Sequence, residues 1–413
     1  MAQDYNDKFP IKTATACNSK WTWSTIWLTQ KTTSSCHRVS PVSLDPDNFS
    51  NFHNLPKKIE DRQLMLEGQW PSGGCEYCQH IEQSGGHSDR MHNNSIGGYV
   101  PKELKINPTA VNVTPRIVEI FAENTCNFSC IYCNEELSSQ IQFENRKFGH
   151  DNRIIKSTLG FPDTTKLLDA FLDWLDNNIQ ELARLHLLGG ETFIQHDLLT
   201  RVFEIIERRP NPNLQLNIFS NFNVPERYWN SYTNKIKDYA KSGHIERLDL
   251  TCSIDCWGPQ AEYVRHGLDL NRLESYLAWS AEQSEDWLYL NINQTISSMT
   301  IKTMPELIEK IKQYSKHRRI GQYFEFLNGY DFQHPEIYDY SVWSDDMDRI
   351  LATLPNETFD QQEVFPRMIG IQKHLQARCQ TDAGKITQLH NYLDELDRRR
   401  GTNWRNLFPH LII

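Results

Sequence analysis

Short apolar stretches alternate with amphipathic segments through the middle of the chain. Residues 184–188 (Arg-Leu-His-Leu-Leu) are typical of a buried strand, and residues 164–182 carry apolar side chains at helical spacing. Strand–helix alternation of this kind predicts an α/β fold with a parallel sheet and right-handed crossovers. The same pattern predicts further strands at 116–121, 214–219, 247–254, 288–296 and 323–327, and helices at 197–208 (capped by Asp197), 225–242, 271–283 and 301–314.

The segments around this regular region have a different character. Residues 1–100 are rich in Ser, Asn, Gly and His, with few long periodic helices, and a link containing several prolines follows them. Residues 331–413 are polar and mostly helical. We therefore expect three parts: 1–100, 114–330 and a helical C-terminal extension at 331–413. The polar stretch 134–163 has little periodicity and is expected to be an active-site flap or loop.

Composition narrows the class of protein. The 413 residues are 38% hydrophobic and 23% charged, and no apolar run approaches the roughly 20 residues of a membrane helix. The N-terminus has no signal-peptide pattern, so we expect a cytoplasmic protein with no membrane contact. A net charge of −10 argues against nucleic acid as the main partner. Ten cysteines without an export signal indicate metal or redox chemistry rather than disulfides.

Three cysteines stand close together directly after the first predicted strand of the regular region. They lie in Cys126-Asn127-Phe128-Ser129-Cys130-Ile131-Tyr132-Cys133, with the spacing C-x3-C-x2-C. Loops at the carboxyl ends of parallel strands are where α/β folds place their chemistry. Three thiolates are one ligand short of a closed zinc site, whereas cysteine thiolates also hold iron–sulfur clusters. The motif indicates a cluster with one open position; zinc or three unrelated thiols are the alternatives.

Four more cysteines lie in the N-terminal segment: Cys17, Cys36, Cys75 and Cys78. The last two form a C-x2-C pair, and the first two flank residues 21–29, which are expected to form a strand ending in a turn. Two distant cysteines plus one such pair make a complete four-ligand set, for zinc or for a cluster. His37, His80, His87 and His92 also lie in this segment, but four cysteines already suffice.

With Tyr132 before its last cysteine, the C-x3-C-x2-C motif resembles that of the radical S-adenosylmethionine (SAM) superfamily. The resemblance implies a [4Fe-4S] cluster on Cys126, Cys130 and Cys133, whose open iron chelates SAM. Reductive cleavage of SAM would give a 5′-deoxyadenosyl radical that takes a hydrogen atom from substrate. The implied fold is a partial (β/α)6 barrel, which agrees with the predicted repeats over 114–330.

The N-terminal segment resembles the twitch domain, a shortened relative of the SPASM domain that carries an auxiliary [4Fe-4S] cluster. The similarity runs from Arg62–Gly68 through the C-x2-C pair to Ser88-Asp89-Arg90, and it returns near the end of the chain at residues 398–404. It implies that Cys17, Cys36, Cys75 and Cys78 hold the second cluster. SPASM domains usually follow the radical SAM motif, whereas this segment precedes it.

Further resemblance to the family implies residues that contact SAM. Gly189-Gly190-Glu191 follows the strand at 184–188, where two glycines permit close backbone approach and the carboxylate would accept the methionine ammonium group. Arg265 would hold the methionine carboxylate, its alternative being an ordinary surface arginine. Asn293 shares a strand face with Asn291 and Thr295 that points into the barrel or is a solvated edge. The remaining expected contacts are Tyr132, Ser220, Asn221, Ser253 and Asp255.

The resemblance to SPASM and twitch proteins implies modification of a peptide or protein side chain by crosslinking, epimerisation or oxidation, with electrons supplied by a flavodoxin- or ferredoxin-type protein. A small-molecule dehydrogenase or isomerase is the first alternative. RNA base modification and a zinc-stabilised scaffold are further ones. Cys252, Cys256 and Cys379 are expected to be small buried hydrophobes, with a radical, acid or ligand role as the alternative.

Overall fold

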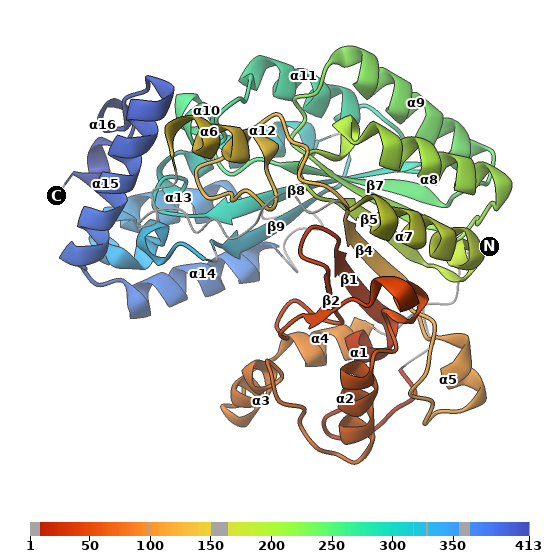
Figure 1. Cartoon of the computed structure of the whole chain (residues 1–413). Coiled ribbons are helices and arrows are strands. Elements are labelled where there is room, and N and C mark those ends of the chain that lie inside the picture. The colour runs from red at the N-terminus through yellow and green to blue at the C-terminus, as the bar shows by residue number, and fades with distance from the viewer. Residues whose placement is uncertain are drawn as a thin grey trace.

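The computed structural model describes residues 9–96, 99–149, 164–316, 318–327, 329–354 and 364–412. A nine-stranded sheet runs in the order β3-β2-β1-β4-β5-β6-β7-β8-β9 (Figure 1). Strands β1 and β4 to β9 are parallel, while β2 and β3 are antiparallel. The predicted α/β class is therefore confirmed, as a mostly parallel sheet with helices.

Every predicted repeat of the regular region is present. Its strands are β4 (Ile117–Phe121), β5 (Arg184–Leu188), β6 (Gln215–Ser220), β7 (Arg247–Ser253), β8 (Leu288–Ile296) and β9 (Ile320–Phe326). Its main helices are α7 (Thr165–Asn178), α8 (His196–Arg208), α9 (Glu226–Lys241), α11 (Leu270–Ala281) and α12 (Met304–Tyr314). One detail was wrong: Gln195 precedes α8, so Asp197 lies in its first turn and is not its cap.

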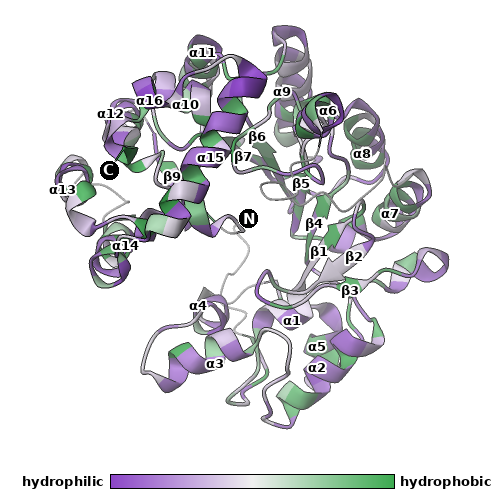
Figure 2. Cartoon of the chain, turned by 60° about the vertical axis from the view of Figure 1, so that its left-hand side comes forward, coloured by the Kyte–Doolittle hydropathy of each residue, from purple (hydrophilic) through white to green (hydrophobic). Residues whose placement is uncertain are grey.

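The two faces of the sheet differ in chemistry. One face carries a row that pairs in register from β1 to β9 and is buried against the helices: Ile26, Ile120, Leu187, Ile218, Leu250, Leu290 and Ile320. The helices α7, α8, α9 and α11 turn apolar sides toward this face, and Figure 2 shows the hydrophobic colour gathered there. The opposite face is rich in polar residues, as strand alternation allows.

The N-terminal segment is joined to the main sheet. Strand β1 (Trp23–Trp27) pairs in parallel with β4, and β2 (Thr32–Ser34) and β3 (Val42–Ser43) extend the same edge. The strand expected within 21–29 is thus confirmed, but it adds a seventh parallel strand to the six that were predicted. Four helices of the segment, α1 (Asn18–Thr22), α2 (Pro56–Leu66), α3 (Glu76–Gln83) and α4 (Asp89–Ile96), lie below the sheet in Figure 1.

The C-terminal extension is helical, as expected, with α13 (Ser344–Thr353), α14 (Val364–Arg378), α15 (Ala383–Arg400) and α16 (Trp404–Leu407). These helices share a second core, which also contains Ile131 of the cysteine loop. In the polar stretch 134–163, residues Ser139–Phe148 form helix α6, and residues 150–163 lie outside the described part of the chain.

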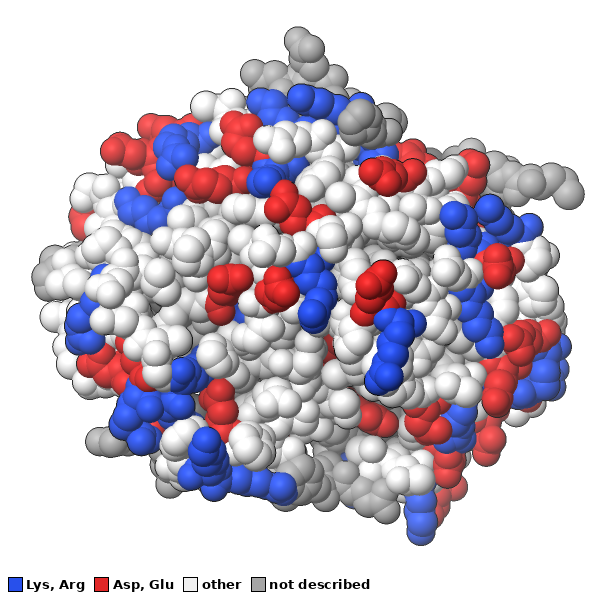
Figure 3. All heavy atoms as spheres, turned by 90° about the horizontal axis from the view of Figure 1, so that it is seen from above, with Lys and Arg blue, Asp and Glu red and all other residues white. Residues whose placement is uncertain are grey.

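Two further properties concern the surface. Among the described residues, no helix is both long and apolar enough to span a bilayer. Figure 3 shows one face of the molecule on which acidic and basic side chains are interspersed. That face presents no extended patch of a single charge, which an electrostatic nucleic-acid surface would need.

Candidate functional site

The cysteine loop follows β4 at the carboxyl edge of the sheet and is held on both sides. Its backbone N–H groups at Ser129 and Ile131 donate to the carbonyls of His266 and Val264, each over 2.9 Å. On the other side, the Ser139 hydroxyl at the start of α6 lies 3.1 Å from the backbone nitrogen of Cys126 and accepts its hydrogen bond. The loop is therefore positioned by two segments distant from it in sequence.

The C-terminal extension holds the same loop from a third direction. Tyr392 of α15 donates its hydroxyl hydrogen bond to the carbonyl of Ile131, and the Gln333 amide donates to the same oxygen over 3.2 Å. Tyr330 donates to the carbonyl of Cys133 over 3.3 Å. No local sequence pattern predicts this role, because the bonded residues lie about 200 or more positions apart in the chain.

Cys130 of the loop is buried and Cys126 and Cys133 are half-buried, and the surroundings of all three thiols favour the protonated form. Burial, aided by the neighbouring Cys130, raises the pKa of Cys133 to about 12. Burial likewise raises the pKa values of Cys126 and Cys130, although the positive charge of Arg265 opposes the rise at Cys130. In the described part of the chain, no three His, Cys, Asp or Glu side chains are arranged as a ready metal-ligand set. Ligand binding would require these thiols to converge and to lose their protons.

The two glycines after β5 approach the backbone that leads into the cysteine loop, and this close contact explains why both positions are glycine. Gly190 donates its N–H to the carbonyl of Glu123, and Glu191 donates to that of Thr125, over 3.0 and 2.8 Å. A Cβ on Gly190 would lie 2.2 Å from the Thr125 oxygen, and Gly189 has a positive φ of 122°. The sequence suggested that the backbone of these glycines approaches a ligand; in the structure it approaches residues 123–125.

Glu191 joins the ends of two strands. Its carboxylate, fully buried, accepts backbone hydrogen bonds from Asn221 at 2.6 Å and Phe193 at 3.0 Å. Burial raises the pKa of Glu191 to about 7, against the effect of these donors. Asn221 in turn donates its side-chain amide to Asn127 over 2.8 Å, and Ser220 accepts from the N–H of Phe222. Glu191, Ser220 and Asn221 are therefore brought together beside the cysteine loop.

Arg265 is not a surface residue. Its Nε and Nη2 donate to Asp255 over 2.9 and 2.8 Å, and both side chains are buried. Tyr132 donates its hydroxyl to the same carboxylate over 2.6 Å, and the Thr295 backbone donates over 2.8 Å. The surface alternative is wrong, and three residues predicted as separate SAM contacts form one hydrogen-bonded cluster, Tyr132–Asp255–Arg265.

Ser253 and Asn293 pair in register on β7 and β8, on the polar face of the sheet. Both side chains are half-buried, as are Asn291 and Thr295 of the same strand. The solvated-edge alternative is wrong, because β9 pairs with β8 along its outer side. This face would line the interior if the sheet closes on itself.

The four N-terminal cysteines lie near one another and near a buried cation. Burial raises the pKa of Cys17 to about 12 and that of Cys75 to about 11; thiolate charge on neighbouring cysteines adds to the rise and Lys20 opposes it. The buried Lys20 pairs with Asp61 over 2.6 Å. Asp61 also pairs with Lys57 over 2.9 Å, and Lys58 and Arg62 of the same helix α2 are buried as well.

The positive charge of Lys20 acts on the cysteines and opposes the rise in the pKa values of Cys17, Cys36 and Cys75 that burial causes. A metal–thiolate centre on Cys17, Cys36, Cys75 and Cys78 would carry negative charge. The donor set and its electrostatic surroundings therefore suit a cluster at this position.

The three cysteines outside both predicted ligand sets are packed as expected for small hydrophobic residues. Cys252 and Cys256 are fully buried in the main core. Burial raises the pKa of Cys256 to about 12, which makes its thiol a poor nucleophile. Cys379 packs at the edge of the C-terminal core and donates to the Pro335 carbonyl over 3.6 Å.

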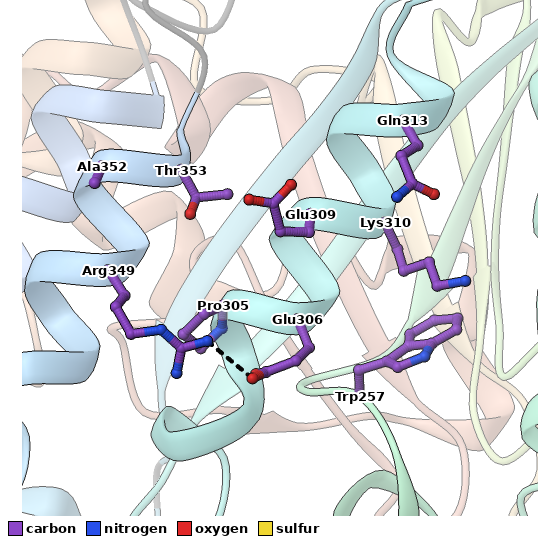
Figure 4. A pocket seen from close by; sticks show the side chains of 9 residues that line it. All are labelled: Trp257, Pro305, Glu306, Glu309, Lys310, Gln313, Arg349, Ala352 and Thr353. Atoms are coloured by element: carbon purple, nitrogen blue, oxygen red, sulfur yellow. Dashed lines mark hydrogen bonds and ion pairs between the residues drawn. The ribbon is translucent and has the colours of Figure 1, made fainter.

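A pocket of about 450 Å³ lies elsewhere, between α12 and α13 (Figure 4). Within it, Arg349 donates to Glu306 over 3.0 Å, and the Lys310 ammonium lies 5.3 Å from the centre of the Trp257 ring. Because α12 covers the apolar side of the sheet, this pocket is separate from the cysteine loop and contains none of the predicted site residues.

Comparison with known proteins adds no assignment: no family model matches the chain, and no curated protein matches it significantly.

Proposed function

We propose that this chain is a radical SAM enzyme whose sheet and helices form a partial (β/α)6 barrel. The observation that carries the proposal is the position of Cys126, Cys130 and Cys133, on a braced loop at the carboxyl edge of a parallel sheet. The three thiols would hold a [4Fe-4S] cluster with one open iron. When bound, this cluster supplies the electron that cleaves SAM to methionine and a 5′-deoxyadenosyl radical.

The protein's own contribution is to position SAM and exclude water. Glu191 would accept the methionine ammonium group, because its buried carboxyl lies beside Ser220 and Asn221 next to the loop. Arg265 uses Nε and Nη2 for Asp255, and no described residue accepts a hydrogen bond from its Nη1. Nη1 would therefore be the group that meets the methionine carboxylate, with Asp255 and Tyr132 fixing the orientation of the guanidinium.

Cys17, Cys36, Cys75 and Cys78 would hold a second, auxiliary [4Fe-4S] cluster, and the buried Lys20 beside them supports this. Peptide or protein side chains are the substrate class that the twitch resemblance favours, with a flavodoxin- or ferredoxin-type electron donor. Small-molecule oxidation is the second candidate, and the burial of Glu119, His186 and Asn217 on the polar face favours it, since an enclosed polar site suits a small group.

The test is 5′-deoxyadenosine formation by the anaerobically reconstituted chain with dithionite and SAM. We expect the wild type to form it and Cys130→Ala to form none, because the variant lacks one cluster ligand. Cys379→Ala is the matched control, since this thiol belongs to neither ligand set. Equal product from the Cys130 variant would refute the assignment.

A further inference from the structure

The polar face of the sheet contains a row of hydrophilic side chains that the proposed cofactors do not use. Register pairing places Thr25, Glu119, His186, Asn217 and Asp249 side by side on five adjacent strands. All five are buried; His186 is 6% exposed and Asn217 is 8% exposed. Buried polar groups normally have hydrogen-bond partners, so this row requires an explanation.

Glu119 organises one side of the row. It accepts a hydrogen bond from Thr25 over 2.7 Å, and its oxygens lie 3.2 Å from His37 Nε2 and 3.4 Å from His186 Nδ1. Despite burial, the two imidazoles keep the pKa of Glu119 well below its ordinary value. Of the two ring nitrogens of His186, Nδ1 is the one in contact with this carboxylate, which leaves Nε2 for another partner.

The other side of the row lacks partners. Within the described residues, no group forms a hydrogen bond with either ring nitrogen of His186 or with Asn217 Oδ1, although all three atoms are buried. Adjacent parallel strands lie roughly 5 Å apart, so His186 and Asn217, which pair in register, are direct neighbours on this face. Asp249 is already paired with Arg247 over 2.7 Å. His186 and Asn217 therefore present unpartnered polar atoms beside the Glu119 carboxylate, an arrangement that favours binding of a hydrogen-bond donor.

An apolar layer separates this row from the cysteine loop. Phe121 and Leu188 pair in register two residues nearer the carboxyl edge, and Phe219 follows on β6. All three are half-buried, and Trp27 stacks on Phe121 with ring centres 5.7 Å apart. A group entering from the edge would pass aromatic and aliphatic side chains before it reaches the polar row.

We propose that the row Thr25–Glu119–His186–Asn217 is a substrate subsite that binds a hydroxyl or amine at the end of an apolar stem. His186 Nε2 and Asn217 Oδ1 accept hydrogen bonds from this terminal group, and Phe121, Leu188 and Phe219 surround the stem. The subsite deepens the proposed function by naming the substrate's chemical class, and it rests on that function only for the reaction that follows binding.

The test uses three probes that share one stem and differ at the tip: butylamine, 1-butanol and butyrate. The reconstituted full chain, labelled with ¹⁵N-histidine, is titrated with each while the Nε2 resonance of His186 is followed by NMR. We expect butylamine or butanol to shift this resonance and butyrate not to, and the two active arms distinguish an amine site from a hydroxyl site.

Two variants test the same contacts by calorimetry. His186→Phe keeps a ring without nitrogen atoms, and Asn217→Leu removes the acceptor, so each is expected to weaken probe binding about tenfold. His196→Phe, on the exposed side of α8, is the matched control and is expected to bind normally. If circular dichroism shows that His186→Phe does not fold, the NMR titration of the wild type and the affinity of Asn217→Leu test the subsite instead.

Equal binding of butyrate, no shift at His186 with any probe, or unchanged affinity in both folded variants would overturn the subsite. None of these readings depends on SAM cleavage. Iron content and 5′-deoxyadenosine measured on the same preparation separate a failure of the subsite from a failure of the proposed function.

Discussion

Removal of the Arg265 guanidinium is predicted to destabilise the protein strongly. Asp255 is 1% exposed and accepts two hydrogen bonds from Arg265, one from Tyr132 and one from the Thr295 backbone. Arg265→Met would leave a buried carboxylate without its counter-charge. Breaking a buried pair from one side costs about 3–5 kcal/mol, which is the loss in free energy of unfolding that we expect.

A double-mutant cycle separates the pair from its surroundings. Arg265→Met leaves the Asp255 carboxylate without its partner, and Asp255→Asn removes the charge of that carboxylate. The double variant should therefore recover part of the lost stability, with a coupling energy of about 2–3 kcal/mol. Urea unfolding followed by tryptophan fluorescence and circular dichroism gives the four free energies. Arg208→Met is the matched control, because its 3.2 Å pair with Asp176 is exposed and is expected to contribute about 0–1 kcal/mol.

A coupling energy below about 0.5 kcal/mol would refute the reasoning, since contacting charges must couple. It would mean that Arg265 is held by other groups and that its role is confined to ligand binding. A large coupling together with lost SAM affinity in Arg265→Lys would instead fit both roles, because lysine keeps the charge and loses the planar fork.

The remaining predictions concern the loop and its neighbours. Cys78→Ala should retain some uncoupled 5′-deoxyadenosine formation while losing substrate turnover, and full retention of both would contradict an auxiliary role. Because burial raises the pKa of Glu191 to about 7, its ionised fraction rises from about one-tenth at pH 6 to about nine-tenths at pH 8. SAM affinity, measured by calorimetry, should therefore tighten as pH rises, whereas Glu191→Gln should give a flat profile; a wild-type profile that is equally flat would exclude the contact. Gly190→Ala should lose more than about 2 kcal/mol of stability in urea unfolding, since its Cβ would lie 2.2 Å from the Thr125 oxygen. Gly370→Ala, with open space around it, is the control and should be neutral or stabilising.

Local patterns were sufficient for the elements of the regular region. The spacing of the apolar residues in Arg184–Leu188 and Thr165–Asn178 predicts a strand and a helix, because burial of one face produces a characteristic spacing for each element. Local patterns could not show that β1 pairs with β4, because nearly 90 residues separate Trp27 from Ile117 and strand pairing leaves no local pattern. Helix α6 was missed because two of its buried residues, Gln142 and Asn145, are polar, so its sequence has little apolar periodicity.

The candidate site was predictable only in part. The cysteine spacing and the residues after each strand pointed to one edge of the sheet, and the structure brings Glu191, Asn221 and Asn127 together there. The pairing of Arg265 with Asp255 depends on tertiary contact and was not foreseen. The polar row did leave a signal: Glu119 and His186 are polar residues in the middle of otherwise apolar strands, and such positions commonly mark a site.

Iron and acid-labile sulfide per chain, measured after anaerobic reconstitution with zinc assayed in parallel, test the central claim most directly. Two [4Fe-4S] clusters require about eight irons and about eight sulfides, with no zinc, and this is the predicted result. About four irons with one zinc would keep the SAM chemistry and make the N-terminal site structural. A chain that takes up no iron under these conditions would contradict the radical SAM assignment.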